Sequence, residues 1–252
     1  MKRKMKQIFG SDGRMLMVAM DHTAFLQAPV DGLVNYGKTI SDSVAAGADA
    51  FLAPIGSAQR HDEEYGASSV IVSIDTNEPF SADQAISRAL AIGADGVKAM
   101  VYPFADDDGV NRSAAIAAFA SSVGLPYLAE PVPGGFSRAD MRTPDIIAAG
   151  ARVAAETGAD MIKTFYTGDP KSMRKVVDYA GVPVVILGGH AKDSLEEFYG
   201  PIWDAINHGG VLGVAVGTNI WTSKNPGGVV RGLNAILHEN ASVEQAVSAA
   251  KK

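Results

Sequence analysis

Short apolar runs recur along the whole chain and alternate with segments whose apolar residues have helical spacing. The runs lack the polar–apolar alternation of a half-exposed strand, so they predict strands that are buried on both faces. They occupy Met15–Met20, Ala50–Ala53, Val70–Ile74, Gly96–Val101, Pro126–Ala129, Met161–Lys163, Val182–Leu187 and Leu212–Val216. The periodic segments predict helices at Ser81–Ile92, Ser113–Val123, Pro144–Thr157, Lys171–Ala180, Ser194–Asn207 and Pro226–His238.

The tripeptide Gly-Ala-Asp stands directly before three of the predicted strands, at residues 47–49, 93–95 and 158–160. Glycine commonly ends a helix in the left-handed conformation, so each repeat marks a step from helix to strand. Strands that alternate with helices, without a linker between them, form one parallel sheet. We therefore predict a single domain over residues 1–252 with a closed (β/α)8 (TIM) barrel. The alternative, an open doubly wound sheet, needs a glycine fingerprint that Met15–Thr23 lacks.

Composition excludes several classes of protein. The 252 residues are 47% hydrophobic, which is enough for a large core, and the net charge of −6 argues against nucleic acid or an anionic membrane as a partner. The chain has no cysteine, which excludes disulfides and thiolate chemistry. No apolar run is long enough to span a membrane, and the basic start is not followed by the apolar core of a signal peptide. We expect a soluble, cytoplasmic protein.

Charged residues lie at the ends of several predicted strands. Asp21 and His22 follow the first strand, Lys98 lies within the fourth, Glu130 ends the fifth and Lys163 ends the sixth. Reactive groups of TIM barrels lie at the carboxyl ends of the strands. Charges inside a closed barrel must be paired or used in chemistry, so we expect these side chains to meet at one mouth.

Lys163 is the candidate for a lysine that forms a Schiff base. Burial favours the neutral form of a lysine, and a neutral amine attacks carbonyl carbons. The resulting iminium ion accepts electrons, so the C3–C4 bond of a ketose can break next to it. Glu130 or Asp21 can transfer the protons that this reaction needs. A second cation, Lys98, favours loss of the Lys163 proton by like-charge repulsion.

Glycine-containing turns follow the last two predicted strands. They free backbone N–H groups to approach an anion, and a short helix beginning near Asn219 would direct its positive end to the same place. We therefore expect a substrate phosphate at the segments Gly188-Gly189-His190 and Gly217-Thr218. His22 and Tyr166 lie close enough to the presumed mouth to contact the substrate.

Four segments, in order along nearly the whole chain, carry a resemblance to a known family. Met17–His22, Lys163–Asp169, Val184–Gly189 and Gly213–Trp221 resemble the DeoC/FbaB/LacD superfamily of class I (Schiff-base) aldolases. The resemblance implies a TIM barrel, an imine on Lys163, no metal, no other cofactor, a sugar phosphate as small-molecule substrate and a homo-oligomer.

The loop after the fifth predicted strand departs from the archaeal fructose-bisphosphate aldolases. Those enzymes carry an acid/base tyrosine in a Tyr-Pro-Arg-Gly loop, and Val132 stands at that place here. Lys98 with Glu130-Pro131 instead resembles the tagatose-bisphosphate and sulfofructose-phosphate aldolases, where lysine and glutamate serve the proton transfers. We therefore assign the general acid/base role to Glu130.

A second departure concerns the anion site. The family commonly has an arginine after Gly217, where this chain has Thr218, and loss of that bidentate cation leaves the nature of the anionic group open. Three nearby side chains are candidate replacements for the arginine, namely His190, Lys192 and Lys224.

Other functions remain open at this point. The same imine would serve a transaldolase- or synthase-type transferase, such as an aminodideoxyheptulosonate synthase or a thiolase-like enzyme. A metal-dependent aldolase is less favoured, because the histidines are scattered without metal-ligand spacing. Gly32–Thr39 matches the Walker A pattern, but it does not directly follow a strand. We interpret it as part of the first barrel helix.

Overall fold

The predicted barrel is confirmed by the computed structural model, which describes residues 3–74, 81–105 and 107–252. Eight parallel strands close in chain order, and β8 pairs with β1. The strands lie within two residues of the predicted runs. They are β1 (Met15–Ala19), β2 (Ala50–Pro54), β3 (Ser69–Ser73), β4 (Gly96–Val101), β5 (Tyr127–Pro131), β6 (Met161–Thr164), β7 (Val184–Leu187) and β8 (Gly213–Val216).

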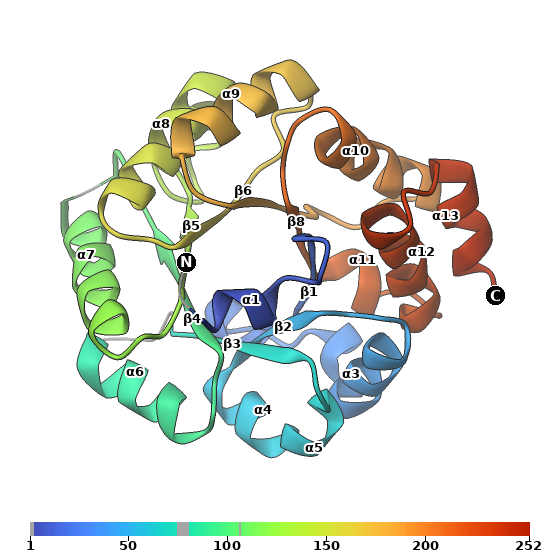
Figure 1. Cartoon of the computed structure of the whole chain (residues 1–252), viewed down its shortest axis with the longest axis horizontal. Helices are drawn as coiled ribbons and strands as arrows, with labels where there is room; N and C mark the ends of the chain where they lie inside the picture. Colours follow the sequence, from blue (N-terminus) through green and yellow to red (C-terminus); the bar gives the residue numbers. More distant parts are fainter. Residues whose placement is uncertain (1–2, 75–80, 106) are drawn as a thin grey trace.

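Helices surround the sheet, and one short helix lies across an opening of the barrel (Figure 1). That helix is α1 (Met5–Ile8). The others are α2 (His22–Leu26), α3 (Tyr36–Ala45), α4 (Ile55–Arg60), α5 (Asp62–Tyr65), α6 (Ala82–Ala91), α7 (Asp107–Ser122), α8 (Pro144–Glu156), α9 (Pro170–Ala180), α10 (Leu195–Asn207), α11 (Thr218–Trp221), α12 (Pro226–His238) and α13 (Val243–Ala250), with 3-10 turns η1 (Asp31–Leu33) and η2 (Ala139–Met141).

Two helix starts differ from the prediction. Helix α7 begins at Asp107 rather than at Ser113, because its first turns are largely polar and carry no apolar periodicity. The Walker-like segment is divided between η1 and the first turn of α3. Its Lys38 forms an ion pair with Asp42 of the same helix, at 2.5 Å. The segment therefore does not form a phosphate loop, which would follow a strand directly.

The barrel interior has its own apolar core, separate from the layer between strands and helices. Met5, Ile8 and Phe9 of the α1 segment pack against inward-facing strand residues such as Met15 and Met161. Lys4 anchors α1 by donating a hydrogen bond to the Ala94 carbonyl at the start of β4, at 2.6 Å. Helix α1 thus closes the amino-terminal end of the barrel, and the carboxyl ends of the strands remain available for chemistry.

The Gly-Ala-Asp repeats tie neighbouring strands together. Each glycine has a positive φ, and each aspartate exchanges two hydrogen bonds with a residue near the start of the preceding strand. The carboxylate accepts from that residue's N–H, and the aspartate N–H donates to its carbonyl. The pairs, with their carboxylate distances, are Asp49 with Leu16 (2.7 Å), Asp95 with Val70 (3.0 Å) and Asp160 with Tyr127 (2.9 Å). The repeat therefore helps to set the register of β1–β2, β3–β4 and β5–β6.

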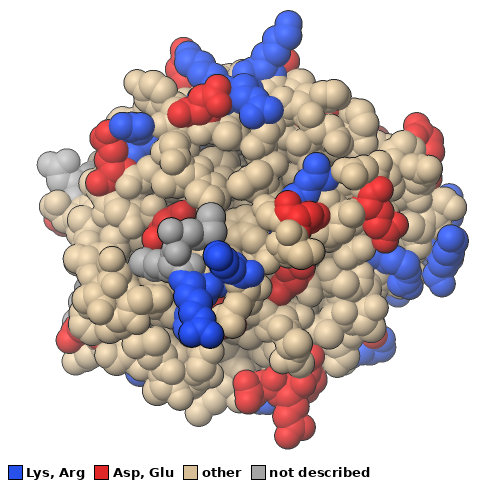
Figure 2. All heavy atoms as spheres, in the orientation of Figure 1, with Lys and Arg blue, Asp and Glu red and all other residues tan. Residues whose placement is uncertain are grey.

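The face that carries α1 shows no broad surface of one charge. Figure 2 shows acidic and basic side chains in scattered groups, separated by uncharged surface. No helix among the described residues is both long and apolar enough to span a membrane.

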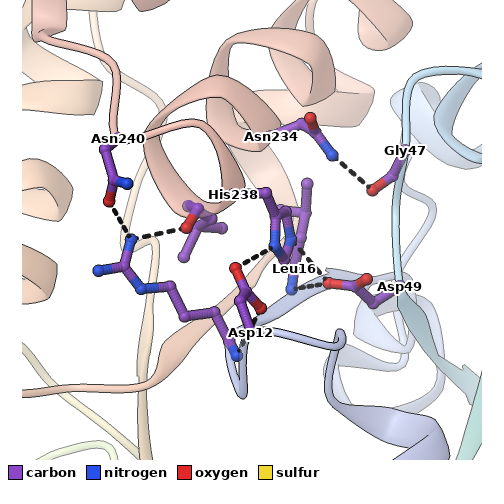
Figure 3. A network of polar contacts seen from close by, with 9 residues as sticks. Asp12, Leu16, Gly47, Asp49, Asn234, His238 and Asn240 are labelled. Atoms are coloured by element: carbon purple, nitrogen blue, oxygen red, sulfur yellow. Dashed lines mark hydrogen bonds and ion pairs between the residues drawn. The ribbon is translucent and has the colours of Figure 1, made fainter.

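A polar network at the amino-terminal end of the barrel joins the segment before β1 to the end of α12 (Figure 3). His238 ends α12, and its Nδ1 lies 2.9 Å from Asp12 Oδ2 while its Nε2 lies 3.0 Å from Asp49 Oδ2. Arg14 donates to the Leu237 carbonyl at 2.6 Å. The hydrogen bond to Asp49 and then that to Asp12 raise the pKa of His238 above 6.5, although burial opposes them.

We expect this network to make stability depend on pH. A histidine with a raised folded pKa contributes stability that is fully present below its unfolded pKa and is lost as pH rises through the folded value. The Tm of the wild type should therefore fall as pH rises from about 6 to about 9. In His238→Gln this part of the pH dependence should disappear. Thermal unfolding at several pH values measures it, and exposed His208→Gln is the control. Equal pH profiles for wild type and His238→Gln would contradict the assignment.

Candidate active site

Four charged side chains form a continuous chain of ion pairs inside the carboxyl end of the barrel. Asp21 Oδ2 lies 3.3 Å from Lys98 Nζ, which lies 3.0 Å from Glu130 Oε2, which in turn lies 3.1 Å from Lys163 Nζ. All four are buried, with relative exposures of 0% to 6%. The predicted convergence of residues from β1, β4, β5 and β6 is therefore found in the structure.

The local folding of each strand explains why these side chains point inward. Alternate residues of a strand face opposite sides, and inward-facing Met161 and Leu128 each precede a charged residue by two positions. Lys163 and Glu130 therefore share the inner face of the barrel with the apolar core below them. Asp21 reaches the same place from the turn between β1 and α2, where it is the N-cap residue.

Opposite charges keep both buried carboxyl groups ionised. Burial alone would raise the pKa of Asp21, but the charges of Lys98 and Lys163 outweigh it and lower that pKa to about 2. Burial likewise opposes ionisation of Glu130, and Lys163 and Lys98 lower its pKa below the ordinary value. Because both folded pKa values are depressed, these carboxylates stabilise the fold above their unfolded pKa values. Each contribution is lost as pH falls through the folded pKa, which for Asp21 is about 2.

His22 and Ser73 complete the surroundings of Asp21. His22 Nδ1 lies 3.9 Å from Asp21 Oδ1, and its ring packs edge-on against Trp221 with 5.2 Å between centroids. Burial, and after it the positive charge of Lys163, lowers the pKa of His22 even though Asp21 opposes them. Ser73 at the end of β3 hydrogen-bonds to Asp21. A serine at a strand end carries no distinctive sequence signal, so its part in the site was not predicted.

The two glycine turns predicted to bind phosphate lie side by side. Asn219 joins them, because its Nδ2 donates to the His190 carbonyl at 3.1 Å and its Oδ1 accepts from the Lys192 N–H at 2.8 Å. Gly217 must be glycine, since a Cβ there would lie 2.2 Å from the Ala19 carbonyl oxygen. The bridging role of Asn219 depends on contacts between two separate loops.

The remaining predicted contacts lie around these turns. Gly188 packs against Val216, Gly189 has a φ of +65°, and His190 is exposed. Thr218, at the start of α11, is partly exposed. The structure brings Gly188 and Gly217 to neighbouring strand ends, and the binding of an anion there stays a prediction.

Tyr166 lies on the helix side of β6. Its ring packs against the core between strands and helices, and its buried hydroxyl has no hydrogen-bond partner among the described residues. Burial, with the nearby charges of Asp204 and Asp169, raises the pKa of Tyr166. A role for Tyr166 in substrate binding therefore stays a prediction. Within the described ranges, no three His, Asp or Glu side chains are arranged to hold a metal ion.

Comparison with known proteins identifies the family. The sequence profile of the DeoC/LacD family of aldolases matches residues 15–223. The chain belongs to this family. It is an enzyme of the aldolase (lyase) type, and the resemblance is confirmed at this level. The narrower resemblance to the tagatose-bisphosphate and sulfofructose-phosphate branch stays a prediction.

Individual relatives of this aldolase span two activities. It is 33% identical over 249 residues to 2-amino-3,7-dideoxy-D-threo-hept-6-ulosonate synthase of Halobacterium salinarum, covering 95% of this chain and 92% of the relative. It is 28% identical over 250 residues to fructose-bisphosphate aldolase class 1 of Thermoproteus tenax, covering 93% and 94%. A solved archaeal fructose-1,6-bisphosphate aldolase, with its catalytic lysine bound to a carbinolamine intermediate, superposes with a TM-score of 0.80 at 26% identity over 94% of this chain and 98% of that one.

Lys98 lies between Asp21 and Glu130, so its removal should change the stability of this aldolase. We expect Lys98→Met to lower the free energy of unfolding by roughly 3–5 kcal/mol at neutral pH, because it leaves Asp21 and Glu130 buried with less positive charge beside them. Urea denaturation measures the loss. Lys38→Met is the matched control, since Lys38 is 72% exposed in its pair with Asp42 and should cost less than about 1 kcal/mol. Similar small losses in both variants would contradict the prediction.

Proposed function

We propose that this protein, over residues 1–252, is a class I aldolase that cleaves or forms a carbon–carbon bond of a phosphorylated or otherwise anionic ketose. Lys163 forms the Schiff base and Glu130 acts as general acid/base. The observation that carries the proposal is the buried Lys163 amine, 3.1 Å from the Glu130 carboxylate. We further expect a cytoplasmic homo-oligomer that needs no cofactor.

The first half of the reaction forms the iminium ion. The Lys163 ammonium gives up a proton to Glu130, and the free amine attacks the ketone carbon to form a carbinolamine. Glu130 then returns a proton to the carbinolamine hydroxyl, which leaves as water. The iminium ion on Lys163 carries one positive charge, as the ammonium did, so Glu130 has a cation beside it before and after this step. Lys98 stays paired with Asp21 and Glu130 and holds the carboxylate in place.

The second half breaks the carbon–carbon bond. Ionised Glu130 accepts the proton of the C4 hydroxyl, the C3–C4 electron pair moves into the iminium ion, and an aldehyde leaves. The protonated Glu130 returns this proton to C3 of the enamine that remains. Hydrolysis of the resulting iminium ion then releases the second product and regenerates the Lys163 ammonium. The lowered pKa of Glu130 keeps the carboxyl ionised at neutral pH, so it is available to accept the C4 hydroxyl proton.

A synthase-type transferase is the second candidate. The relative from Halobacterium salinarum is such a synthase, at 33% identity. In that case the enamine on Lys163 attacks a second carbonyl compound instead of taking up a proton. Lys163 and Glu130 would have the same roles, and only the acceptor would differ. Release of the free ketone product without any added aldehyde, identified by mass, indicates the aldolase, whereas product that forms only when an acceptor aldehyde is present indicates the transferase.

We expect Lys163→Met to abolish both the covalent adduct and turnover. The wild type is incubated with candidate ketose phosphates and sodium borohydride, which reduces the imine, and the modified peptide is located by mass spectrometry. The adduct should map to Lys163, and Lys163→Met should lose at least about a thousandfold in activity, as other covalent enzymes do without their nucleophile. Lys175→Met, a surface lysine paired with Asp145, is the control. Activity that EDTA abolishes, with no trapped adduct, would instead indicate a metal-dependent aldolase.

We expect Glu130→Gln to separate imine formation from bond cleavage. The variant keeps the shape of the side chain but cannot accept the C4 proton. It should still trap an adduct on Lys163 after long incubation, more slowly than the wild type because water must replace Glu130 in the proton transfers of imine formation. Turnover should fall by about a hundred- to ten-thousandfold, the usual contribution of a general base. Parallel measurement of adduct formation and aldehyde release tests this. A fully active Glu130→Gln enzyme would show that the acid/base assignment is wrong.

A further inference from the structure

Arg142, in the loop between β5 and α8, is a cation without a charged partner among the residues that the structure describes. Its guanidinium carbon lies 4.7 Å from the centre of the Phe165 ring, and Nη2 donates to the Phe136 carbonyl at 3.3 Å. Its Nε is buried and has no hydrogen-bond partner among the described residues. A half-buried guanidinium with an unsatisfied donor is costly, because it loses hydration without a full replacement.

The same loop contains a second arginine whose charge is compensated. Arg138 donates through Nε and Nη2 to the two oxygens of Asp140, at 2.9 and 2.8 Å. Within the part of the chain that the structure describes, no carboxylate forms an ion pair with Arg142. Arg142 therefore has the donors for an external oxyanion, whereas those of Arg138 are already used.

The loop holds Arg142 in place. The Val132 N–H donates to the Val101 carbonyl and the Gly134 N–H to the Pro103 carbonyl, each at 2.8 Å, so the loop is fixed to the end of β4. Gly134 has a φ of +68°, and a Cβ there would lie 2.4 Å from Met141 Sδ. These bonds fix the start of the loop, and the contacts with the Phe165 ring and the Phe136 carbonyl hold the guanidinium before any ligand arrives. A group that is already in position lowers the entropic cost of binding.

Arg142 lies near the ends of the strands that carry the proposed catalytic pair. Phe165, on which it stacks, follows Lys163 by two residues, or about 7 Å of extended chain. The loop itself follows the strand of Glu130. If Glu130 takes the C4 hydroxyl proton, carbons C4 to C6 of a bound ketose must extend toward β5. The far end of the substrate then lies on the side of Arg142, while the glycine turns after β7 and β8 serve the C1 end.

We propose that Arg142 binds an oxyanion at the aldehyde-side end of the substrate and sets the preference for substrates that carry one. The inference rests on the proposed function, since it needs the imine at Lys163 to fix the direction of the sugar. Arg142 supplies a cation, whereas the glycine turn after β8 has Thr218 in place of the family's arginine. The candidate replacements on the β7 and β8 side (His190, Lys192 and Lys224) concern the other end of the substrate.

Two sugars that differ only at C6 test the proposal. Fructose 1,6-bisphosphate and fructose 1-phosphate are each titrated into the enzyme, and the adduct trapped by borohydride is quantified. In the wild type the bisphosphate should reach half-maximal adduct at a concentration at least about tenfold lower than the monophosphate. Arg142→Met should raise that concentration about ten- to a hundredfold for the bisphosphate and leave the monophosphate unchanged. Arg142→Lys should give an intermediate value, and Arg138→Met should match the wild type.

The outcomes separate this inference from the proposed function. An adduct with the monophosphate shows that Arg142→Met is folded and that imine formation is intact. Equal losses for both sugars, no loss for the bisphosphate, or a wild type without preference would each overturn the role of Arg142. Absence of an adduct in the wild type with both of these sugars and with the other candidate ketose phosphates would refute the proposed function, and the inference with it.

Discussion

Two lysines and two carboxylates share one buried space at the carboxyl end of the barrel, and the rest of the site depends on that arrangement. Burying any one of these charges alone would cost several kcal/mol, and each is offset by the neighbour of opposite sign. A single oxygen, Oε2 of Glu130, contacts both ammonium groups. The same arrangement holds a base beside the amine that the proposed chemistry requires.

The barrel supplies the surroundings that give these charges their effect. Helix α1 and the inward-facing methionines fill the space beneath them, so solvent does not reach the cluster from below. The aspartates of the Gly-Ala-Asp repeats tie strand pairs at the base, and His238 joins the last long helix to the first strand region. Rigid strands from several parts of the chain therefore carry the reactive groups, and the variable loops lie above them.

The site has two parts, the charged cluster at the strand ends and a rim of loops around it. Membership in the DeoC/LacD aldolases agrees with the barrel, and the charged cluster includes Lys163 of β6. The rim includes Thr218 at the β8 turn and Arg142 stacked on Phe165. Since function lies in the site rather than in the fold, we expect the choice of substrate to be decided at this rim.

The amino-acid sequence by itself determined the eight strands, most helix limits and the identity of the charged strand-end residues. These follow from local rules, because hydrophobic periodicity, glycine stops and the alternation of strand side chains act over a few residues. Only the tertiary structure decided that Lys98 bridges Asp21 and Glu130, that Asn219 joins two loops and that Arg142 lies over Phe165. Such pairings join residues far apart in the chain, so they depend on barrel closure, strand register and the path of each loop, and no local pattern encodes them.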